Sequence, residues 1–288
     1  MNWKLEQAKL RKAAELGEAV AKAVGFDLAP VDPFAVVHSE GRRLQALGDN
    51  FRDAFDGRLE YHGAYFLLLY NTKYDGWDHE GSHHPKVTFT VAHELGHYFL
   101  EDHRHYLMGG GGPHWSQTDF ESSNLAEREA DFFATGLLMP QYLLRKRVNT
   151  QPPTLSDVRR ARSDFRVSLT SMMIRWVQLC DFPCAVTSVV GDKIEWGFTS
   201  PGFKRIGAYV VRRGERVSSR QACSFLAADR SAAVYREGDG WSVAERWLEL
   251  ERHNLEVHEN YVVVPSTRQM LVFLTADEDE AAADSNWE

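Results

Sequence analysis

The stretch that decides the fold spans residues 87–100 and reads VTFTVAHELGHYFL. Its apolar residues recur at helical spacing, so we expect a helix over about residues 86–101. Residues four apart share one face of a helix. His93 and His97 can therefore reach one metal ion, while Glu94 stands beside it. The pattern predicts a metal site built on this helix.

Each member of this pattern has a chemical task in peptide hydrolysis. Neutral imidazoles are common zinc ligands, and a zinc ion with an open coordination position activates water. Glu94 is the expected general base, which takes a proton during attack and hands it to the leaving amine. Zinc is the expected metal, although the same donors also suit other divalent ions such as manganese. The alternative, two surface histidines on a helix, fits poorly with the apolar residues around them.

A catalytic zinc usually has three protein ligands, so a third must lie elsewhere in the chain. The metzincin continuation HExxHxxGxxH is not found, because residues 99–103 read FLEDH, with Leu100 at the glycine position. Thirty residues after His97, Glu127 is the expected ligand, and Asp131 would accept the second ring N–H of a ligand histidine. A plain helix salt bridge is the alternative for Asp131. Glu129 points about 200° away from Glu127 around a helix, which makes it a poorer ligand.

A peptidase also needs a donor that stabilises the developing oxyanion. The candidates near the helix are His105, His103 and Tyr98, and we favour a residue of a loop over residues 103–115. The alternative is that the loop histidines are simply solvated. The glycine run at 109–112 lacks a Walker lysine, so it predicts a flexible flap and not a phosphate-binding loop.

Taken together, these motifs resemble the ImmA/IrrE family of metallopeptidases. The resemblance is carried by a strand that ends in Tyr70-Asn71, by VAHELGHYFL, and by LAEREADFFATGLLMP. It is strong over about residues 30–145 and weaker beyond them. Asp131 stands where the family often has Asn, which is a mild departure. The resemblance implies a zincin-like fold for the first part of the chain.

The resemblance also implies a narrow substrate class. Members of the family typically cleave a helix-turn-helix repressor encoded beside them, which switches on stress-response, mobile-element or antiphage genes. We therefore expect a zinc-dependent endopeptidase with such a repressor as its partner. The alternative is a DNA-binding or ligand-sensing regulator that inhibits a repressor by binding without cutting it.

The rest of the chain predicts an α+β protein with several parts. Helices are expected over residues 5–24, 33–47 and 122–139, and strands over 65–70, 185–190, 193–198, 208–211, 261–264 and 270–275. Residues 242–251 are ambiguous. The expected parts are a zincin-like domain (1–150), a helix-turn-helix-like connector whose two helices break near Val167 (151–180), a β-rich regulatory domain of GAF-like type (181–276) and an acidic disordered tail (277–288).

Two surface features leave alternatives open. The strand over residues 65–70 is either an exposed edge that takes the substrate as an added strand or an internal strand with covered edges. Arg159, Arg160, Arg162 and Arg166 either contact DNA phosphates or form a solvated helical face. The formal net charge of −8 argues against broad affinity for nucleic acid.

Composition also bounds the compartment. The N-terminus has no apolar signal-peptide region, and no window is apolar enough to span a membrane, so we expect a cytoplasmic protein without membrane contact. The three cysteines, Cys180, Cys184 and Cys223, lack the spacing of a redox or zinc pair. We expect buried or incidental thiols.

Overall fold

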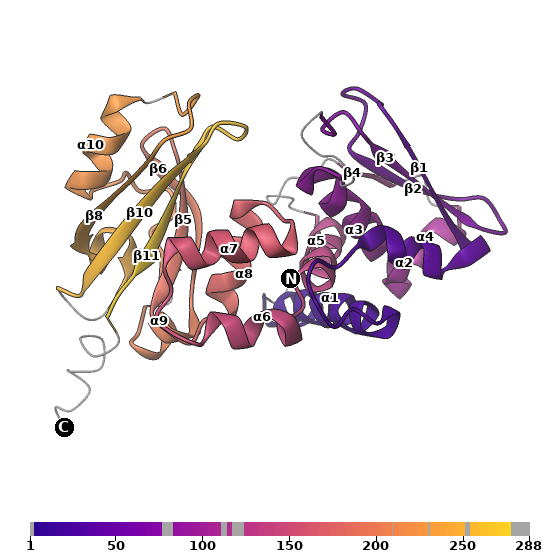
Figure 1. Cartoon of the computed structure of the whole chain (residues 1–288), viewed down its shortest axis with the longest axis horizontal. Helices are drawn as coiled ribbons and strands as arrows, with labels where there is room; N and C mark the ends of the chain where they lie inside the picture. Colours follow the sequence, from indigo (N-terminus) through magenta and orange to yellow (C-terminus); the bar gives the residue numbers. More distant parts are fainter. Residues whose placement is uncertain are drawn as a thin grey trace. The chain divides into compact units, whose positions relative to one another are not determined.

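A computed structural model describes residues 3–76, 83–110, 114–116, 124–208, 210–229, 231–250 and 254–277. Residue contacts divide the chain into two compact units, residues 1–143 with 162–168, and residues 144–161 with 169–288. Helices and sheets occur in both units, so the predicted α+β class is confirmed (Figure 1). The domain ranges expected from the sequence stay predictions, and the acidic tail beyond Asp277 lies outside the described residues.

The first unit begins with a long N-terminal helix, α1 (Trp3–Val24), that packs mainly against α5 (Leu125–Leu138). The unit also contains α2 (Pro33–Ser39), the 3₁₀ turn η1 (Gly41–Arg43), α3 (Pro85–Phe99) and α4 (Glu101–Met108). Both α1 and α3 pack against α5. The helix start of α5 is fixed by Asn124, whose side chain accepts a hydrogen bond from the Ala126 backbone N–H at 3.1 Å.

The sheet of the first unit has four strands in the order β1-β3-β2-β4. They are β1 (Leu44–Asp49), β2 (Gly57–Tyr61), β3 (Phe66–Asn71) and β4 (His114–Ser116). β1 runs parallel to β3, and the other pairs are antiparallel. The strand predicted over residues 65–70 is β3, and it lies between β1 and β2. The alternative of an internal strand is therefore correct, and the exposed-edge interpretation of this strand is wrong.

Two segments differ from the sequence-based expectation. The predicted helix over residues 33–47 ends at Ser39, because Gly41 adopts a left-handed backbone with φ of 60°, and the chain continues as β1. In β1 the backbone groups find hydrogen-bond partners in β3. A longer helix would have had to provide other partners for these groups. Conversely, residues 103–108 of the predicted loop over 103–115 belong to helix α4, which begins with two acidic residues that favour a helix N-terminus.

The approach of α3 to α5 depends on a glycine. A β-carbon at Gly96 would lie 2.9 Å from the Cα of Ala130 and 3.2 Å from its Cβ. Contacts that short do not occur between real side chains, so any larger residue at position 96 must push the two helices apart. Gly96 lies between the two histidines of α3, and Ala130 between the two predicted acidic residues of α5. The helix contact therefore sets the distance between these groups.

Beyond α5 the chain forms further helices and a second sheet. The helices are α6 (Gln141–Val148), α7 (Leu155–Phe165), α8 (Leu169–Leu179), α9 (Pro201–Arg205) and α10 (Arg220–Ala228), and the strands are β5 (Cys184–Val190), β6 (Lys193–Thr199), β8 (Glu237–Val243), β10 (Glu256–Val264) and β11 (Gln269–Thr275). These strands are antiparallel in the order β6-β5-β11-β10-β8. Two short strands, β7 (Val210–Val211) and β9 (Leu248–Glu249), pair with each other in a separate sheet. The 3₁₀ turn η2 (Ala244–Arg246) precedes β9.

The β-rich prediction for this part of the chain is confirmed, as are the strands expected over residues 185–190 and 193–198 and the break between α7 and α8. At that break Arg166 has a positive φ of 53°. Three helices, α6, α9 and α10, were not predicted. Residues 242–251, ambiguous in the sequence, contribute the end of β8, η2 and β9.

A buried carboxylate ties this second sheet to its neighbouring segments. Glu259 is fully buried in β10 and accepts hydrogen bonds from Ser219 at 2.8 Å, from the indole N–H of Trp247 at 2.5 Å, and from Ser242 and Tyr261. Ser219 is also the N-cap of α10. The carboxylate therefore joins the start of α10, β8 and the residue that follows η2 to β10 through neutral donors.

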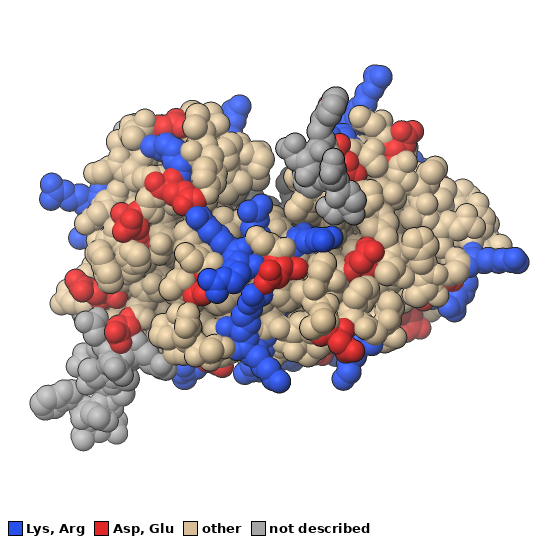
Figure 2. Space-filling view, viewed as in Figure 1, with Lys and Arg blue, Asp and Glu red and all other residues tan. Residues whose placement is uncertain are grey.

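The surface carries both charge signs, and Lys and Arg gather where Figure 1 places α6 and α7 (Figure 2). Several of these cations face carboxylates: Arg159 pairs with Glu237, Arg160 lies 3.9 Å from Asp157, and Arg145 lies 3.8 Å from Asp181. Binding of nucleic acid by this segment stays a prediction without a test. None of the described helices is long and apolar enough to cross a membrane. Cys180 and Cys184 are buried free thiols, and Cys223 is an exposed one.

We predict that Gly96→Val destabilises the fold by about 1–3 kcal/mol, because the added carbons overpack the contact with Ala130. Chemical denaturation followed by circular dichroism would measure the change. Gly76→Val is the matched control, since a β-carbon at Gly76 meets nothing within 4 Å. Equal stability of the two variants would contradict the close-contact argument.

We also predict that Glu259→Leu lowers the free energy of unfolding by at least about 2 kcal/mol, because the Trp247 N–H can only donate and would be left buried without an acceptor. Tryptophan fluorescence during denaturation would report it. Glu256→Leu alters an exposed residue of the same strand and should change stability by less than about 0.5 kcal/mol.

Candidate metal centre

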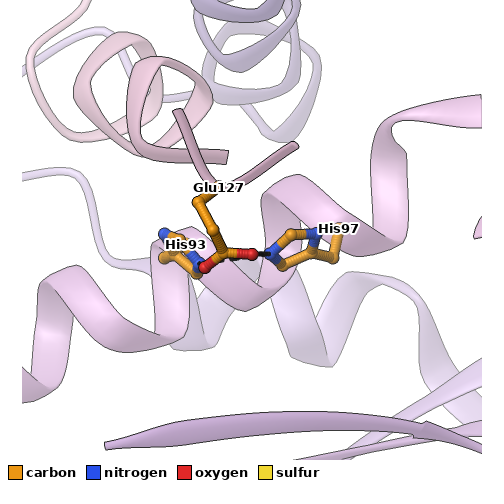
Figure 3. A group of neighbouring side chains, drawn as sticks. All are labelled: His93, His97 and Glu127. Atoms are coloured by element: carbon orange, nitrogen blue, oxygen red, sulfur yellow. Dashed lines mark hydrogen bonds and ion pairs between the residues drawn. The ribbon is translucent and has the colours of Figure 1, made fainter. Parts of the chain in front are cut away.

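Three side chains from α3 and α5 converge in the first unit. His93 and His97 of α3 point toward each other, with 3.1 Å between their Nε2 atoms, and Glu127 of α5 reaches between them (Figure 3). The carboxylate oxygens of Glu127 lie 3.4 Å from Nε2 of His93 and 3.7 Å from Nε2 of His97. One ligand atom from each residue falls within 4.8 Å of the others. The structure thus brings together the three residues predicted as metal ligands.

Asp131 fixes the orientation of the first histidine. Its Oδ1 lies 2.8 Å from Nδ1 of His93, and both side chains are buried. A carboxylate accepts only, so Nδ1 of His93 donates, and the ring is held with its other nitrogen toward Glu127. The predicted hydrogen bond from a histidine ring N–H to Asp131 is therefore present in the structure.

The predicted general base lies beside the cluster under the sheet. Glu94 is fully buried, and in the sequence it lies between His93 and His97. A β-carbon at Gly57, the first residue of β2, would lie 2.5 Å from Oε1 of Glu94. Only glycine lets the β2 backbone come this close to the carboxylate. The sequence did not indicate this contact, because residues 57 and 94 are far apart in the chain and belong to no common motif.

The three candidates for oxyanion stabilisation have different environments. Tyr98 is buried, and its hydroxyl donates to Glu40 at 2.7 Å. Burial and this hydrogen bond raise the pKa of Tyr98 to about 12. His105 is exposed on α4, and His103, on the same helix, has its Nδ1 2.9 Å from Nδ1 of His97. Among the described contacts, only that of His103 reaches the three clustered residues. The role of any of the three in catalysis stays a prediction.

The electrostatics of the cluster favour positive charge. Burial by itself lowers the pKa of His93, but hydrogen bonds to Asp131 and Glu127 and the nearby charge of Glu94 raise it to about 10. Acidic groups of α5 thus make the site receptive to a proton in the metal-free protein. The same charges favour a divalent cation, and two imidazole nitrogens with one carboxylate oxygen are a donor set suited to zinc.

A third carboxylate of α5, Glu129, also contacts this region, and the sequence argument missed this contact. Oε2 of Glu129 lies 3.2 Å from Nε2 of His103. Helical geometry correctly disfavours Glu129 as a ligand, because it leaves the helix on another side from Glu127. Its contact with His103 depends on α4, a helix that was not expected.

A helix with His-Glu-x-x-His and a glutamate from a second helix defines the zincin-like class of metallopeptidase domain. Residues 79–176 match the family described as the IrrE N-terminal-like domain, Peptidase M78. This part of the chain therefore carries a domain of the IrrE N-terminal-like type, in agreement with the motifs that resemble the ImmA/IrrE family.

A solved structure described as a Mycobacterium tuberculosis transcriptional regulator is similar to this chain, with a TM-score of 0.55 and 12% sequence identity. The similarity covers 96% of this chain and 80% of that chain, and at this identity it concerns the fold alone. A search of the curated proteins found no significant match.

We predict that metal binding strengthens as pH rises, because the ion must displace the proton that His93 holds below about pH 10. The apparent association constant for zinc should rise about tenfold per pH unit over the neutral range, where one proton is released per ion bound. Calorimetry in buffers of different ionisation enthalpy would count the released protons.

The raised pKa of His93 also makes the stability of the metal-free protein depend on pH. Protonated His93 stabilises the fold fully below pH 6.5, and this contribution is lost as pH rises through about 10.

A zinc affinity that is independent of pH would contradict the assignment of His93 as a proton-competing ligand.

Proposed function

We propose that this chain is a metal-dependent endopeptidase that uses zinc and cleaves a specific partner protein. The observation that carries the proposal is the convergence of His93, His97 and Glu127 on one point, with Glu94 buried beside them. A structural metal site has no use for a general base, so the position of Glu94 favours catalysis. Membership of a peptidase family supports the same reaction class.

The residues of the site divide the work of hydrolysis. His93, His97 and Glu127 would hold the ion, which when bound polarises the peptide carbonyl and lowers the pKa of water. Glu94 takes the proton of the attacking water and delivers it to the leaving amine. Asp131 keeps His93 in the orientation that binding requires.

The substrate would enter as an extended segment beside the sheet. Because β3 is internal, the proposed docking edge is β4, which pairs with β2 next to Gly57 and Glu94. Backbone hydrogen bonds to a strand edge are independent of sequence, so surrounding loops would supply the selectivity. An extended substrate also presents its peptide bond to the adjacent metal centre.

For the partner, we propose a helix-turn-helix transcriptional repressor whose cleavage derepresses stress-response, mobile-element or antiphage genes. Two findings support a role in transcription: the family of the N-terminal domain and the similarity in fold to a solved structure described as a transcriptional regulator. The β-rich unit would then be a regulatory module of GAF-like type.

The test is cleavage of the repressor encoded by the neighbouring regulator gene. The purified chain with zinc should yield a discrete product by mass spectrometry, and a chelator should prevent it. Glu94→Gln should lower the cleavage rate by at least about a hundredfold while zinc still binds, because only the proton acceptor is lost. Glu101→Gln, an exposed change on α4, is the matched control and should keep full activity.

The other possible outcomes would each contradict a part of the proposal. Cleavage that persists in Glu94→Gln would sink the assignment of the general base. An intact repressor that nevertheless leaves its DNA would favour the alternative, a regulator that inhibits by binding. An intact repressor that stays on its DNA, in the presence of bound zinc, would exclude this repressor as the substrate.

A further inference from the structure

We infer that His103 and Glu129 are positioning residues that set the tautomer of His97 and thereby prepare it to bind a metal. This inference rests on the proposed function, since it concerns the same site. It assigns a role to a pair of side chains that the sequence argument had placed elsewhere, His103 as an oxyanion donor and Glu129 as a poor ligand.

The three side chains form a chain of hydrogen bonds from α3 through α4 to α5. Nδ1 of His97 lies 2.9 Å from Nδ1 of His103, and Nε2 of His103 lies 3.2 Å from Oε2 of Glu129. His97 is fully buried, and the side chains of His103 and Glu129 are only 9% and 14% exposed. The chain is therefore shielded from competing water along most of its length.

The carboxylate decides the direction of every hydrogen bond in this chain. Glu129 only accepts, so Nε2 of His103 must donate to it. A neutral His103 then has a bare Nδ1, which accepts from Nδ1–H of His97. His97 is left with a bare Nε2, the atom that faces Glu127 and the other histidine.

A second contact is compatible with the same arrangement. The Nε2 atoms of His93 and His97 are 3.1 Å apart, so at most one of them can carry a proton toward the other. The chain through His103 and Glu129 assigns the bare nitrogen to His97. Without it, the neutral ring would be free to place its proton on Nε2, where it would block a metal.

Both ligand histidines are thus oriented by acidic residues of α5, but by different routes. Asp131 contacts His93 directly, whereas Glu129 acts on His97 through His103. The residues Glu127, Glu129 and Asp131 fall within about one helical turn. A single short segment therefore supplies one ligand and both orienting charges.

The test measures zinc affinity by competition with a chromogenic chelator, independently of peptidase activity. His103→Phe removes the hydrogen bonds but fills the space, and it should weaken zinc binding about 10- to 100-fold. Glu129→Gln removes the charge that fixes the direction and should weaken binding in the same sense. Asp102→Asn, an exposed change on the same helix, is the matched control and should bind zinc like the original chain.

A direct readout is the tautomer of His97 in the metal-free protein. Long-range proton–nitrogen spectra of ¹⁵N-histidine-labelled chain should show His97 protonated at Nδ1, and should show a mixture of tautomers in Glu129→Gln. Circular dichroism would verify the fold of each variant; if His103→Phe does not fold, Glu129→Gln decides.

Unchanged zinc affinity in a folded variant, or His97 protonated at Nε2 in the original chain, would overturn the inference. A chain that binds zinc but cleaves no repressor would count against the proposed function and leave the inference standing. If the original chain binds no zinc, the proposed function fails, and the tautomer spectra still decide the role of Glu129.

Discussion

The candidate metal centre depends on the close approach of α3 and α5. The missing side chain at Gly96 lets the helix with both histidines come within contact of Ala130, and this contact places Glu127 and Asp131 on either side of it opposite the histidines. Because two rigid helices fix four functional groups through one contact, the ligand atoms are held together without support from a loop. Small residues at this contact matter as much as the ligands themselves.

The second constraint on the site is the cost of burying charge. His93, His97 and Glu94 are almost completely inaccessible, so each polar atom needs a partner or an ion. The acidic residues of α5 meet this need, since they raise the pKa of His93 and give both imidazoles a defined orientation. The same arrangement that stabilises a proton in the metal-free protein favours a divalent cation in its place.

Much of the site could be predicted from sequence because its members lie on two regular helices. Spacing alone put His93 and His97 on one face, and placed Asp131 one turn after Glu127. Other features depend on contacts between distant segments. Neither the strand β1 nor the helix α4 was expected, because local propensity competes with sheet pairing and with packing that the sequence does not display.

By itself the sequence determined the α+β class, the two helices of the candidate metal centre and the family that residues 79–176 match. The tertiary structure decided that β3 is internal, that Gly57 touches Glu94, and that His103 joins His97 to Glu129. The physical reason is the separation along the chain of the residues that determine each feature. Helical periodicity is written into neighbouring residues, whereas strand order and contacts between helices arise only when the whole chain buries its apolar surface.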